Sequence, residues 1–350
     1  MKPKHLVTIA VLCLLIGLPV GLFIRAVAQN TPTSQGDAKQ EASNYRLSGP
    51  YTHKNLTVFL VHGKDLTKKT FLTLQEALAQ KKVRVYETRD VNELAIRNLS
   101  NQDIYVQSGD VVRGGDQDRM ISIDFIVPPK SGRMPIAAFC VEPGRWSKRG
   151  TEDSAFFSSS ENIVATKDLK LAAKREKSQD AVWQKVKVAQ EKLVVNVAGA
   201  AGGLRETSSY EVSVENSKIK ETTEAYIKAL SGIVQNKSDV IGYVFAINGQ
   251  VNSADVYASR GLFVKLWPKL LKASAVEAIA EMNKAEEAKP VAAETVETFL
   301  TESEKPAPAA KEVTRRVRVV TKEDDKNIFF ETQDRSQNDG WVHRNYIRKQ

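Results

Sequence analysis

The segment from Val240 to Tyr257 restricts the possible folds more than any other part of this chain. Its first half, VIGYVFAI, is apolar on both faces of an extended strand, which is typical of a strand buried on both sides. The dipeptide Asn248-Gly249 follows and favours the tight turn of a two-residue β-hairpin. The chain from Val251 to Tyr257 supplies the return strand, so this segment predicts a buried hairpin.

A second pattern indicates that the surrounding sheet is antiparallel. Apolar Ile121, Ile123 and Phe125 alternate with polar Ser122 and Asp124. This period of two is typical of a half-buried strand in an antiparallel sheet.

The order of the remaining elements predicts the fold class. Amphipathic helices are expected from about residue 166, from about residue 217, and from 261 to about 283. A short helix is expected at 73–80. Strands are expected at 56–61, 83–88, 104–107, 120–127, 135–142, 313–320, 327–332 and 341–347. The sequence therefore predicts an α+β fold of mostly antiparallel sheet, with about three packed helices and C-terminal strands that return to the sheet.

The N-terminus predicts export. Lys2 and Lys4 precede an apolar run at 6–24, and small residues up to Ala28 form a cleavage site for a signal peptide at 1–28. The mature protein would then be periplasmic or extracellular. The alternative is an uncleaved anchor, because the run approaches the ~20 residues that span a bilayer; this segment is the only membrane attachment expected.

Composition divides the rest of the chain. Residues 29–44 are polar and predict a flexible spacer, and residues 45–283 predict the main α+β domain. Residues 284–312 are rich in Ala, Glu, Lys and Pro and predict a linker or a weak solvent-exposed helix. Residues 313–350 are expected to complete the domain.

The positions of the cysteines and histidines argue against an intramolecular disulfide and against a metal site. Cys13 lies in the predicted signal and leaves Cys140 alone, so the mature chain has no intramolecular disulfide. His53, His62 and His343 show no metal-ligand spacing with one another or with Cys140. We expect neither a metal nor a cofactor.

The charge balance restricts the partners. The chain has 51 Lys and Arg residues and 42 Asp and Glu residues, which gives a net charge of +9. Three of the basic residues, Lys2, Lys4 and Arg25, lie in the predicted signal peptide. The other basic residues are mixed with acidic ones, which does not favour a nucleic-acid groove. The balance is compatible with a small anionic ligand or a protein partner.

The first candidate site is SGDVVRGGDQDR at 108–119. Gly109, Gly114 and Gly115 permit unusual backbone angles or the close approach of a ligand. Arg113 and Arg119 offer planar donor groups that suit carboxylate or phosphate. The segment lacks the Gly-Lys-Ser/Thr ending of a P-loop. A hairpin loop whose arginines pair with the adjacent aspartates is an equally good interpretation.

The second candidate site is FCVEPGRW at 139–146. Cys140 and Glu142 lie on the same face of a strand, and a nearby cation could activate the thiol. A small buried hydrophobic residue is the favoured interpretation of Cys140, because free cysteines are so often buried. Glu142, Arg145 and Trp146 are better candidates for ligand contact, with Trp146 as a stacking face.

Seven segments in consistent order resemble the domain family named for its association with ADP-ribosylglycohydrolases and the rhodanese-phosphatase superfamily. They are FLTLQEAL (71–78), VRVYE (83–87), SGDVVRGGDQDR (108–119), FCVEPGRW (139–146), QDAVW (179–183), GYVFAINGQVNSADVYAS (242–259) and WVHRNYI (341–347). The resemblance covers about residues 45–347. It implies a single α+β domain and a gene association with ADP-ribose and NAD metabolism, without a demonstrated activity.

The resemblance also implies site residues. The ligand-binding candidates are Gly109, Gly114, Gly115, Gln117, Arg119, Arg145 and Trp146, and the catalytic candidates are Glu142 and Cys140. Asp116 and Asp118 depart from the expected pattern, since each carboxylate would compete for the arginines. Secondary candidates, for which a structural hydrogen bond is the favoured role, are Asp255, Tyr257, His343 and Tyr346.

Two functions fit these patterns, and whether the chain is an enzyme stays open. The first is an exported binding or accessory module, in which the 109–119 loop and the 142–146 strand end hold a small anionic ligand or a partner segment. The second is a hydrolase or transferase for an ADP-ribose-type or phosphorylated substrate, with Glu142 as general base. Convergence of Arg119, Glu142, Arg145 and Trp146 on one open pocket would support a site at this loop.

Overall fold

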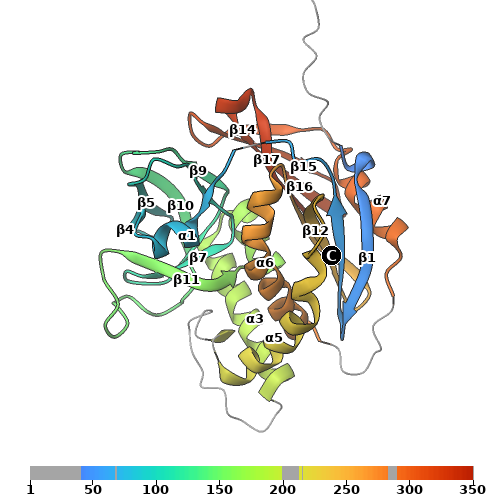
Figure 1. Cartoon of the computed structure of the whole chain (residues 1–350). Helices are drawn as coiled ribbons and strands as arrows, with labels where there is room; N and C mark the ends of the chain where they lie inside the picture. Colours follow the sequence, from blue (N-terminus) through green and yellow to red (C-terminus); the bar gives the residue numbers. More distant parts are fainter. Residues whose placement is uncertain (1–40, 68, 199–212, 215, 283–289, 350) are drawn as a thin grey trace, which may run out of the picture. The chain divides into compact units, whose positions relative to one another are not determined.

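The predicted hairpin lies near the middle of an eight-stranded antiparallel sheet (Figure 1). Strand β12 (Val240–Ile247) is buried at every position, and β13 (Gln250–Tyr257) pairs with the C-terminal strand β17 (Gly340–Arg348). The sheet order is β1 (Arg46–His53), β2 (Leu56–His62), β12, β13, β17, β16 (Asn327–Asp334), β15 (Val317–Glu323) and β14 (Ala309–Glu312). The C-terminal strands therefore return to the sheet, as predicted.

The structure is a computed structural model that describes residues 41–67, 69–198, 213–214, 216–282 and 290–349, with residues 160–164 and 198 described by backbone only. All described residues belong to one compact unit. The expected export signal at 1–28, residues 29–40 of the expected spacer and residues 284–289 of the expected linker lie outside the described residues.

A second sheet of six antiparallel strands nearly closes on itself. Its order is β11 (Phe157–Val164), β7 (Asp110–Gly114), β8 (Arg119–Ile121), β10 (Met134–Cys140), β5 (Glu93–Asn98) and β4 (Val83–Asp90). Its two edges meet where Tyr86 bridges to Phe156, and where the Glu87 N–H donates to the Ala155 carbonyl at 3.1 Å. The expected 108–119 loop is thus mostly a pair of strands with a short turn between them.

The expected strand at 120–127 is two strands that belong to different sheets. It begins in β8 and ends in β9 (Phe125–Val127), which joins β6 (Ile104–Val106) and β3 (Leu72–Thr73) in a three-stranded sheet. The chain turns between them because Asp124 leaves the ladder and accepts the Ser108 N–H at 2.8 Å. A buried carboxylate here replaces the solvent-facing polar residue that alternation predicted.

Helix α6 (Arg260–Ala280) packs between the two large sheets, with contacts to β12 and β13 on one side and β11 on the other (Figure 1). Five further α-helices are described: α1 (Leu74–Ala79), α2 (Lys167–Leu171), α3 (Gln179–Ala198), α5 (Ser217–Leu230) and α7 (Ala293–Ser303). The α+β class is confirmed, with more helices than the three predicted. None of the described helices is both long and apolar enough to cross a membrane.

The expected linker at 284–312 differs from the structure. Residues 293–303 form α7, which buries Val296, Phe299 and Leu300 against the large sheet, and β14 pairs with β15. The spacing i, i+3, i+4 places these three side chains on one helix face, and the Ala/Glu composition obscured it. The expected spacer also ends early, because Ala42 is buried and its N–H donates to Glu304 at 3.3 Å.

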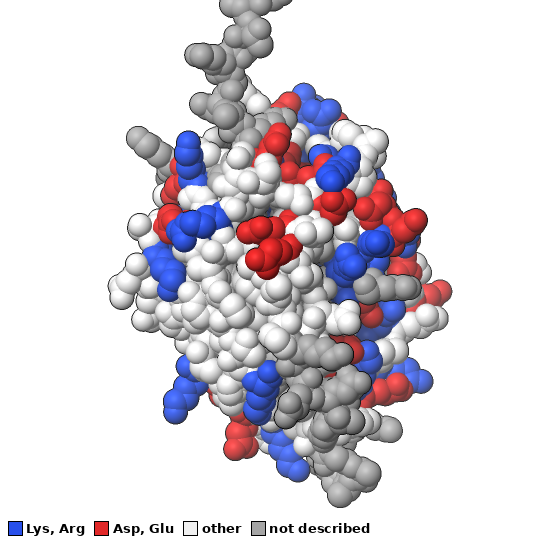
Figure 2. Space-filling model, turned by 90° about the vertical axis from the view of Figure 1, so that its right-hand side faces the viewer, with Lys and Arg blue, Asp and Glu red and all other residues white. Residues whose placement is uncertain are grey.

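The charged surface residues are mixed in sign. On the face shown in Figure 2, basic and acidic side chains lie interspersed around a largely uncharged centre, and neither sign covers a broad area.

Candidate functional site

The glycines of the first candidate site are required by neighbouring protein atoms. Gly114 (φ +129°) and Gly115 (φ +56°) form the turn between β7 and β8. A Cβ at Gly114 would lie 2.6 Å from the Phe156 carbonyl oxygen, and one at Gly115 would lie 2.5 Å from Glu87 Oε2. Both distances are far shorter than a normal contact, so these glycines allow close packing of the chain on itself.

Arg119 is buried, and both of its terminal nitrogens donate to strand β4 and the residue that follows it. Its Nη1 donates to the carbonyl oxygens of Asp90 at 3.0 Å and Val91 at 2.8 Å, and its Nη2 donates to Glu87 Oε1 at 3.1 Å. Only 3% of its side chain is exposed. Arg119 therefore connects β8 to the end of β4. Its Nε has no hydrogen-bond partner among the described residues, but it is buried and closed to a ligand from outside.

Asp118 and Glu142 occupy the donors of two further arginines. Asp118 is fully buried and accepts Arg145 Nη2 at 3.2 Å and Arg149 Nη2 at 2.7 Å. Glu142 accepts Arg145 Nε at 2.6 Å, and Arg149 Nη1 lies 3.7 Å from its second oxygen. Burial opposes the charge of Arg149, but its hydrogen bonds with Asp118 outweigh this and raise its pKa. We call Glu87, Asp118, Arg119, Glu142, Arg145 and Arg149 the arginine cluster.

The other residues of the two candidate sites are buried or bonded within the protein, and Gln117 is the exception in its hydrogen bonding. Burial raises the pKa of the Cys140 thiol, which disfavours a thiolate nucleophile. The Gly109 N–H donates to the Ile121 carbonyl at 2.8 Å. Gln117 is completely buried, and its side-chain amide has no hydrogen-bond partner among the described residues. Asp116 donates its N–H to Glu87 at 3.4 Å.

Trp146 lies apart from the arginine cluster, at the surface. Its side chain is 58% exposed, and its ring contacts Trp183 edge to face at 6.4 Å between centroids. The structure therefore gathers Arg145 and Glu142 with Asp118 in an internally paired cluster and leaves the proposed stacking face in a different environment.

Three of the four secondary candidates meet in the interior. His343 Nδ1 lies 2.7 Å from Asp124 Oδ2, and His343 Nε2 lies 3.0 Å from Asp255 Oδ1. Tyr257 stacks on the imidazole at 4.5 Å between centroids. Burial disfavours a charge on His343, but the two carboxylates outweigh it and raise its pKa. Tyr346 lies elsewhere and donates its hydroxyl to Glu304 at 2.5 Å.

Sequence reasoning missed the other charged groups of this interior. Lys269 of α6 pairs with Asp110 of β7, and Lys170 and Lys174 are buried near Asp255. We call these residues the interior cluster: Asp110, Asp124, Lys170, Lys174, Asp255, Lys269 and His343. The signal was present, because Lys269 interrupts the apolar run LWPKLLK. Lys174 lies in a π-helical turn (Ala172–Glu176), an irregularity that is frequent at functional sites.

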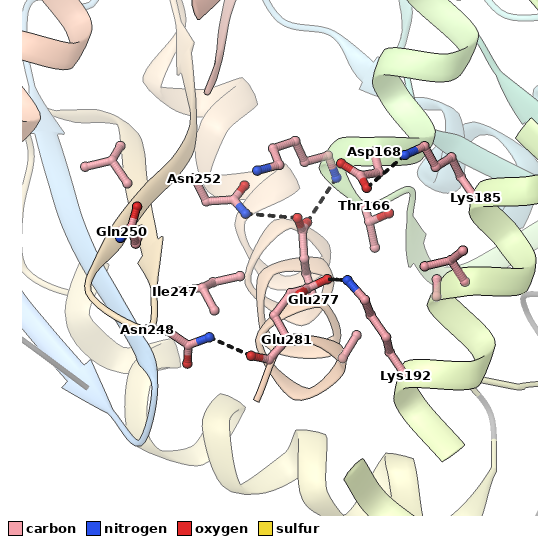
Figure 3. A pocket seen from close by; sticks show the side chains of 15 residues that line it. Thr166, Asp168, Lys185, Lys192, Ile247, Asn248, Gln250, Asn252, Glu277 and Glu281 are labelled. Atoms are coloured by element: carbon pink, nitrogen blue, oxygen red, sulfur yellow. Dashed lines mark hydrogen bonds and ion pairs between the residues drawn. The ribbon is translucent and has the colours of Figure 1, made fainter. Parts of the chain in front are cut away.

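An open cleft of about 280 Å³ lies between α3, the start of α2, the end of α6 and the β12–β13 hairpin (Figure 3). Lys185 and Lys192 project from α3 on one side, and the side-chain amides of the hairpin lie opposite. Glu277 forms part of the floor and accepts Asn252 Nδ2 at 3.0 Å and the Lys167 N–H at 3.1 Å. Burial raises the pKa of Glu277.

The cleft lysines are only weakly paired. Lys185 lies 3.4 Å from Asp168 and Lys192 lies 2.5 Å from Glu281, and about 40% of each of these four side chains is exposed. Such exposed pairs contribute about 0–1 kcal/mol, so either lysine can turn toward a ligand. The charge of Lys167 opposes the rise in the pKa of Glu277, so these two side chains interact electrostatically. Within the described part of the chain, no cluster of His, Cys, Asp and Glu suits a metal ion.

The fold and these sites define an α+β domain with an internally paired arginine cluster, a charged interior and an open polar cleft. Residues 44–347 match the ARG and Rhodanese-Phosphatase-superfamily-associated Protein domain, and the chain belongs to this family. The resemblance of the seven segments is thereby confirmed. Neither the curated proteins nor the solved structures contain a significant match to the chain.

Proposed function

We propose that this chain is an exported accessory module that binds a small anionic ligand in the cleft between α3 and the β12–β13 hairpin. The observation that carries this proposal is the set of accessible lysines at the cleft, Lys167, Lys185 and Lys192. Three carboxylates also line the cleft, those of Asp168, Glu277 and Glu281, and burial raises the pKa of Glu277, which disfavours its charged form. A weaker negative charge on Glu277 leaves the lysines better able to attract an anion.

The contrast with the arginine cluster supports binding in the cleft. Every arginine of that cluster already donates to a buried carboxylate, so an anion there would have to displace a strong internal partner. Glu142 as a general base has little support for the same reason, since it lies between Arg145 and Arg149. We therefore favour a binding module over the hydrolase or transferase.

The size of the cleft favours a small acid. Ligand pockets commonly enclose about 300–1,000 Å³, and this cleft lies at the lower limit. A phosphorylated sugar or a small carboxylic acid fits this volume better than a whole dinucleotide. The gene association with ADP-ribose metabolism that the resemblance of the seven segments implies makes ADP-ribose and its fragments the first compounds to test.

The proposed location rests on the N-terminal sequence alone. Lys2, Lys4 and the apolar run at 6–24 support export, and Ala28 supports cleavage. The N-terminal sequence of the protein recovered from its native cells tests this part: a chain that starts at Gln29 supports it, and an intact Met1 in a cytoplasmic fraction contradicts it.

Calorimetric titration with ADP-ribose, ribose 5-phosphate, citrate and inorganic phosphate tests the ligand site. We expect at least one of these anions to bind, and Lys185→Ala and Lys192→Ala to weaken its binding at least tenfold. Lys187→Ala is the matched control, because Lys187 lies on the same helix with 77% of its side chain exposed and does not line the cleft. Binding that survives both cleft variants but is lost in Arg145→Ala would move the site to the arginine cluster.

A further inference from the structure

A buried lysine and a buried asparagine lie side by side in the interior, and the proposed ligand does not involve them. Lys174 Nζ lies 3.3 Å from Asn345 Oδ1, although the two residues are 171 positions apart in the chain. Lys174 comes from the π-helical turn before α3, and Asn345 from β17 in the middle of the large sheet. Both side chains are buried.

The orientation of the Asn345 amide is fixed by its neighbours. Its Nδ2 donates to the Ala254 carbonyl at 3.2 Å and to Asp255 Oδ1 at 2.9 Å, so the carbonyl side of the amide faces Lys174. The amide nitrogen thus lies against a carboxylate. Asp255 Oδ2 is buried and has no hydrogen-bond partner among the described residues, so it can accept a proton.

The burial of Lys174 favours an uncharged amine, because it removes water from Nζ. The Phe330 ring, whose centroid lies 4.3 Å from Nζ, acts in the opposite direction, since a ring face attracts a charged ammonium. Burial lowers its pKa even though Asp124 and Asp255 oppose the shift. A desolvated, neutral lysine is a nucleophile, and an amine held against a carbonyl reacts far faster than the same groups free in solution.

We propose that Lys174 and Asn345 react to form an amide bond between their side chains. Nζ of the uncharged Lys174 attacks Cγ of Asn345 to form the new C–N bond, and Asp255 Oδ2 takes one of the two protons on Nζ. The bond from Cγ to Nδ2 then breaks, and Asp255 passes that proton to the leaving nitrogen, which departs as ammonia. Nζ keeps its other proton in the new amide, so atoms and charge balance and no oxidant or further reactant is needed.

Such a bond connects the helical layer to the middle strand of the large sheet. It closes a covalent loop that runs from residue 174 to residue 345. A long closed loop lowers the entropy of the unfolded chain more than a short one does, and this stabilises the folded state. Cys140 is the single cysteine of residues 29–350, so a disulfide cannot supply this constraint within the chain. The amide bond takes that role in a protein proposed to function outside the cell.

The mass of the purified full-length protein tests the bond. We expect the wild-type chain to be lighter than its sequence by one ammonia molecule, and a protease digest to contain a branched peptide that joins residues 174 and 345. Lys174→Arg and Asp255→Asn should have the full mass, because one lacks the amine and the other lacks the base. Lys170→Arg is the matched control, since Lys170 lies one helical turn away and is equally buried, and it should keep the mass loss.

The melting temperature provides a second measurement. We expect Lys174→Arg to melt roughly 10 °C below Lys170→Arg, because it loses the covalent loop. A folded wild-type chain that has its full mass overturns the proposal, whatever the variants show. A mass loss that persists in Lys174→Arg also overturns it, since the ammonia would then come from another side chain.

Discussion

The arginine cluster and the cleft both hold three basic side chains beside carboxylates, yet they differ in what those groups can do. Arg119, Arg145 and Arg149 donate to buried acids and join β4, β8 and the chain after β10. Lys185 and Lys192 form exposed pairs at the edge of an open space. Their charges are similar, but the arginines are bonded to buried acids inside the protein, whereas these two lysines are about 40% exposed.

This difference shows that a basic side chain indicates a ligand only if the fold leaves its donors free. Arginine forms bidentate, charge-assisted bonds that persist when buried, so it serves well as an internal connection. Lysine in an exposed pair loses little when its partner changes. The four predictions that follow test this contrast.

Arg119→Ala tests whether the arginine cluster is structural. Removal of the guanidinium leaves Glu87 buried without its main partner, and breaking a buried ion pair from one side costs about 3–5 kcal/mol. Urea denaturation measures the free energy of unfolding. Arg97→Ala, on the exposed face of β5, is the control and should change it by less than about 0.5 kcal/mol. Equal, small effects for both variants would contradict the structural role.

Gly115→Ala tests the close packing of the turn. The added Cβ would meet Glu87 Oε2 at 2.5 Å and Phe157 Cζ at 2.6 Å, so we expect a loss of about 2–3 kcal/mol in the free energy of unfolding. Gly150→Ala has nearly the same backbone angle, φ +55°, but no atom within 4 Å of the added Cβ. It should lose only the backbone part, about 1 kcal/mol. If Gly150→Ala lowers the free energy of unfolding as much as Gly115→Ala does, the effect comes from the backbone conformation and not from close packing.

His343→Gln tests the charge of the interior cluster. Because folding raises the pKa of His343, the charged imidazole stabilises the protein fully below its unfolded value of 6.5, and this contribution is lost as the pH rises through the folded pKa. The free energy of unfolding should therefore fall above pH 6.5 in the wild type, by up to about 1.4 kcal/mol per pH unit. His343→Gln should lack this slope, and His53→Gln should keep it. An unchanged slope in His343→Gln would show that His343 is neutral in the folded protein.

Lys192→Ala tests the other side of the comparison and should have the smallest effect on stability. Its pair with Glu281 is about 40% exposed, so we expect a change within about 0.5 kcal/mol in the free energy of unfolding. Anion binding should weaken in the same variant, as measured by calorimetry. A large loss of stability would mean that Lys192 is a structural residue like Arg119.

Much of the fold was predictable because the signals were local. The Asn248-Gly249 turn and the apolar run of β12 specify a buried hairpin wherever they occur. Helix α1 begins at a capping box formed by Thr73 and Glu76, which needs no distant residue. Helix α7 escaped prediction because its three apolar residues are few, and only the sheet beneath them makes the helix stable.

The candidate site was less predictable because partners come from distant segments. Glu87, the partner of Arg119, is 32 residues away, and Asp124 lies 219 residues from His343. Sequence reasoning identified His343 and Asp255 as secondary candidates but could not show that one imidazole bridges two carboxylates. It identified Arg145 and Glu142 as neighbours in sequence, and they pair at 2.6 Å. Arg119 of the 108–119 segment pairs with the distant Glu87 and not with an adjacent aspartate.

The sequence by itself determined the α+β class, the central hairpin, the return of the C-terminal strands and the family, because periodicity, turn chemistry and ordered motifs are properties of the chain. Only the tertiary structure decided which charged groups are paired internally and which are open. The free energy of a buried charge depends on the partner that packs against it, and no local pattern specifies that partner. The same packing places Lys174 against Asn345, a juxtaposition that exists only once helix and sheet have come together.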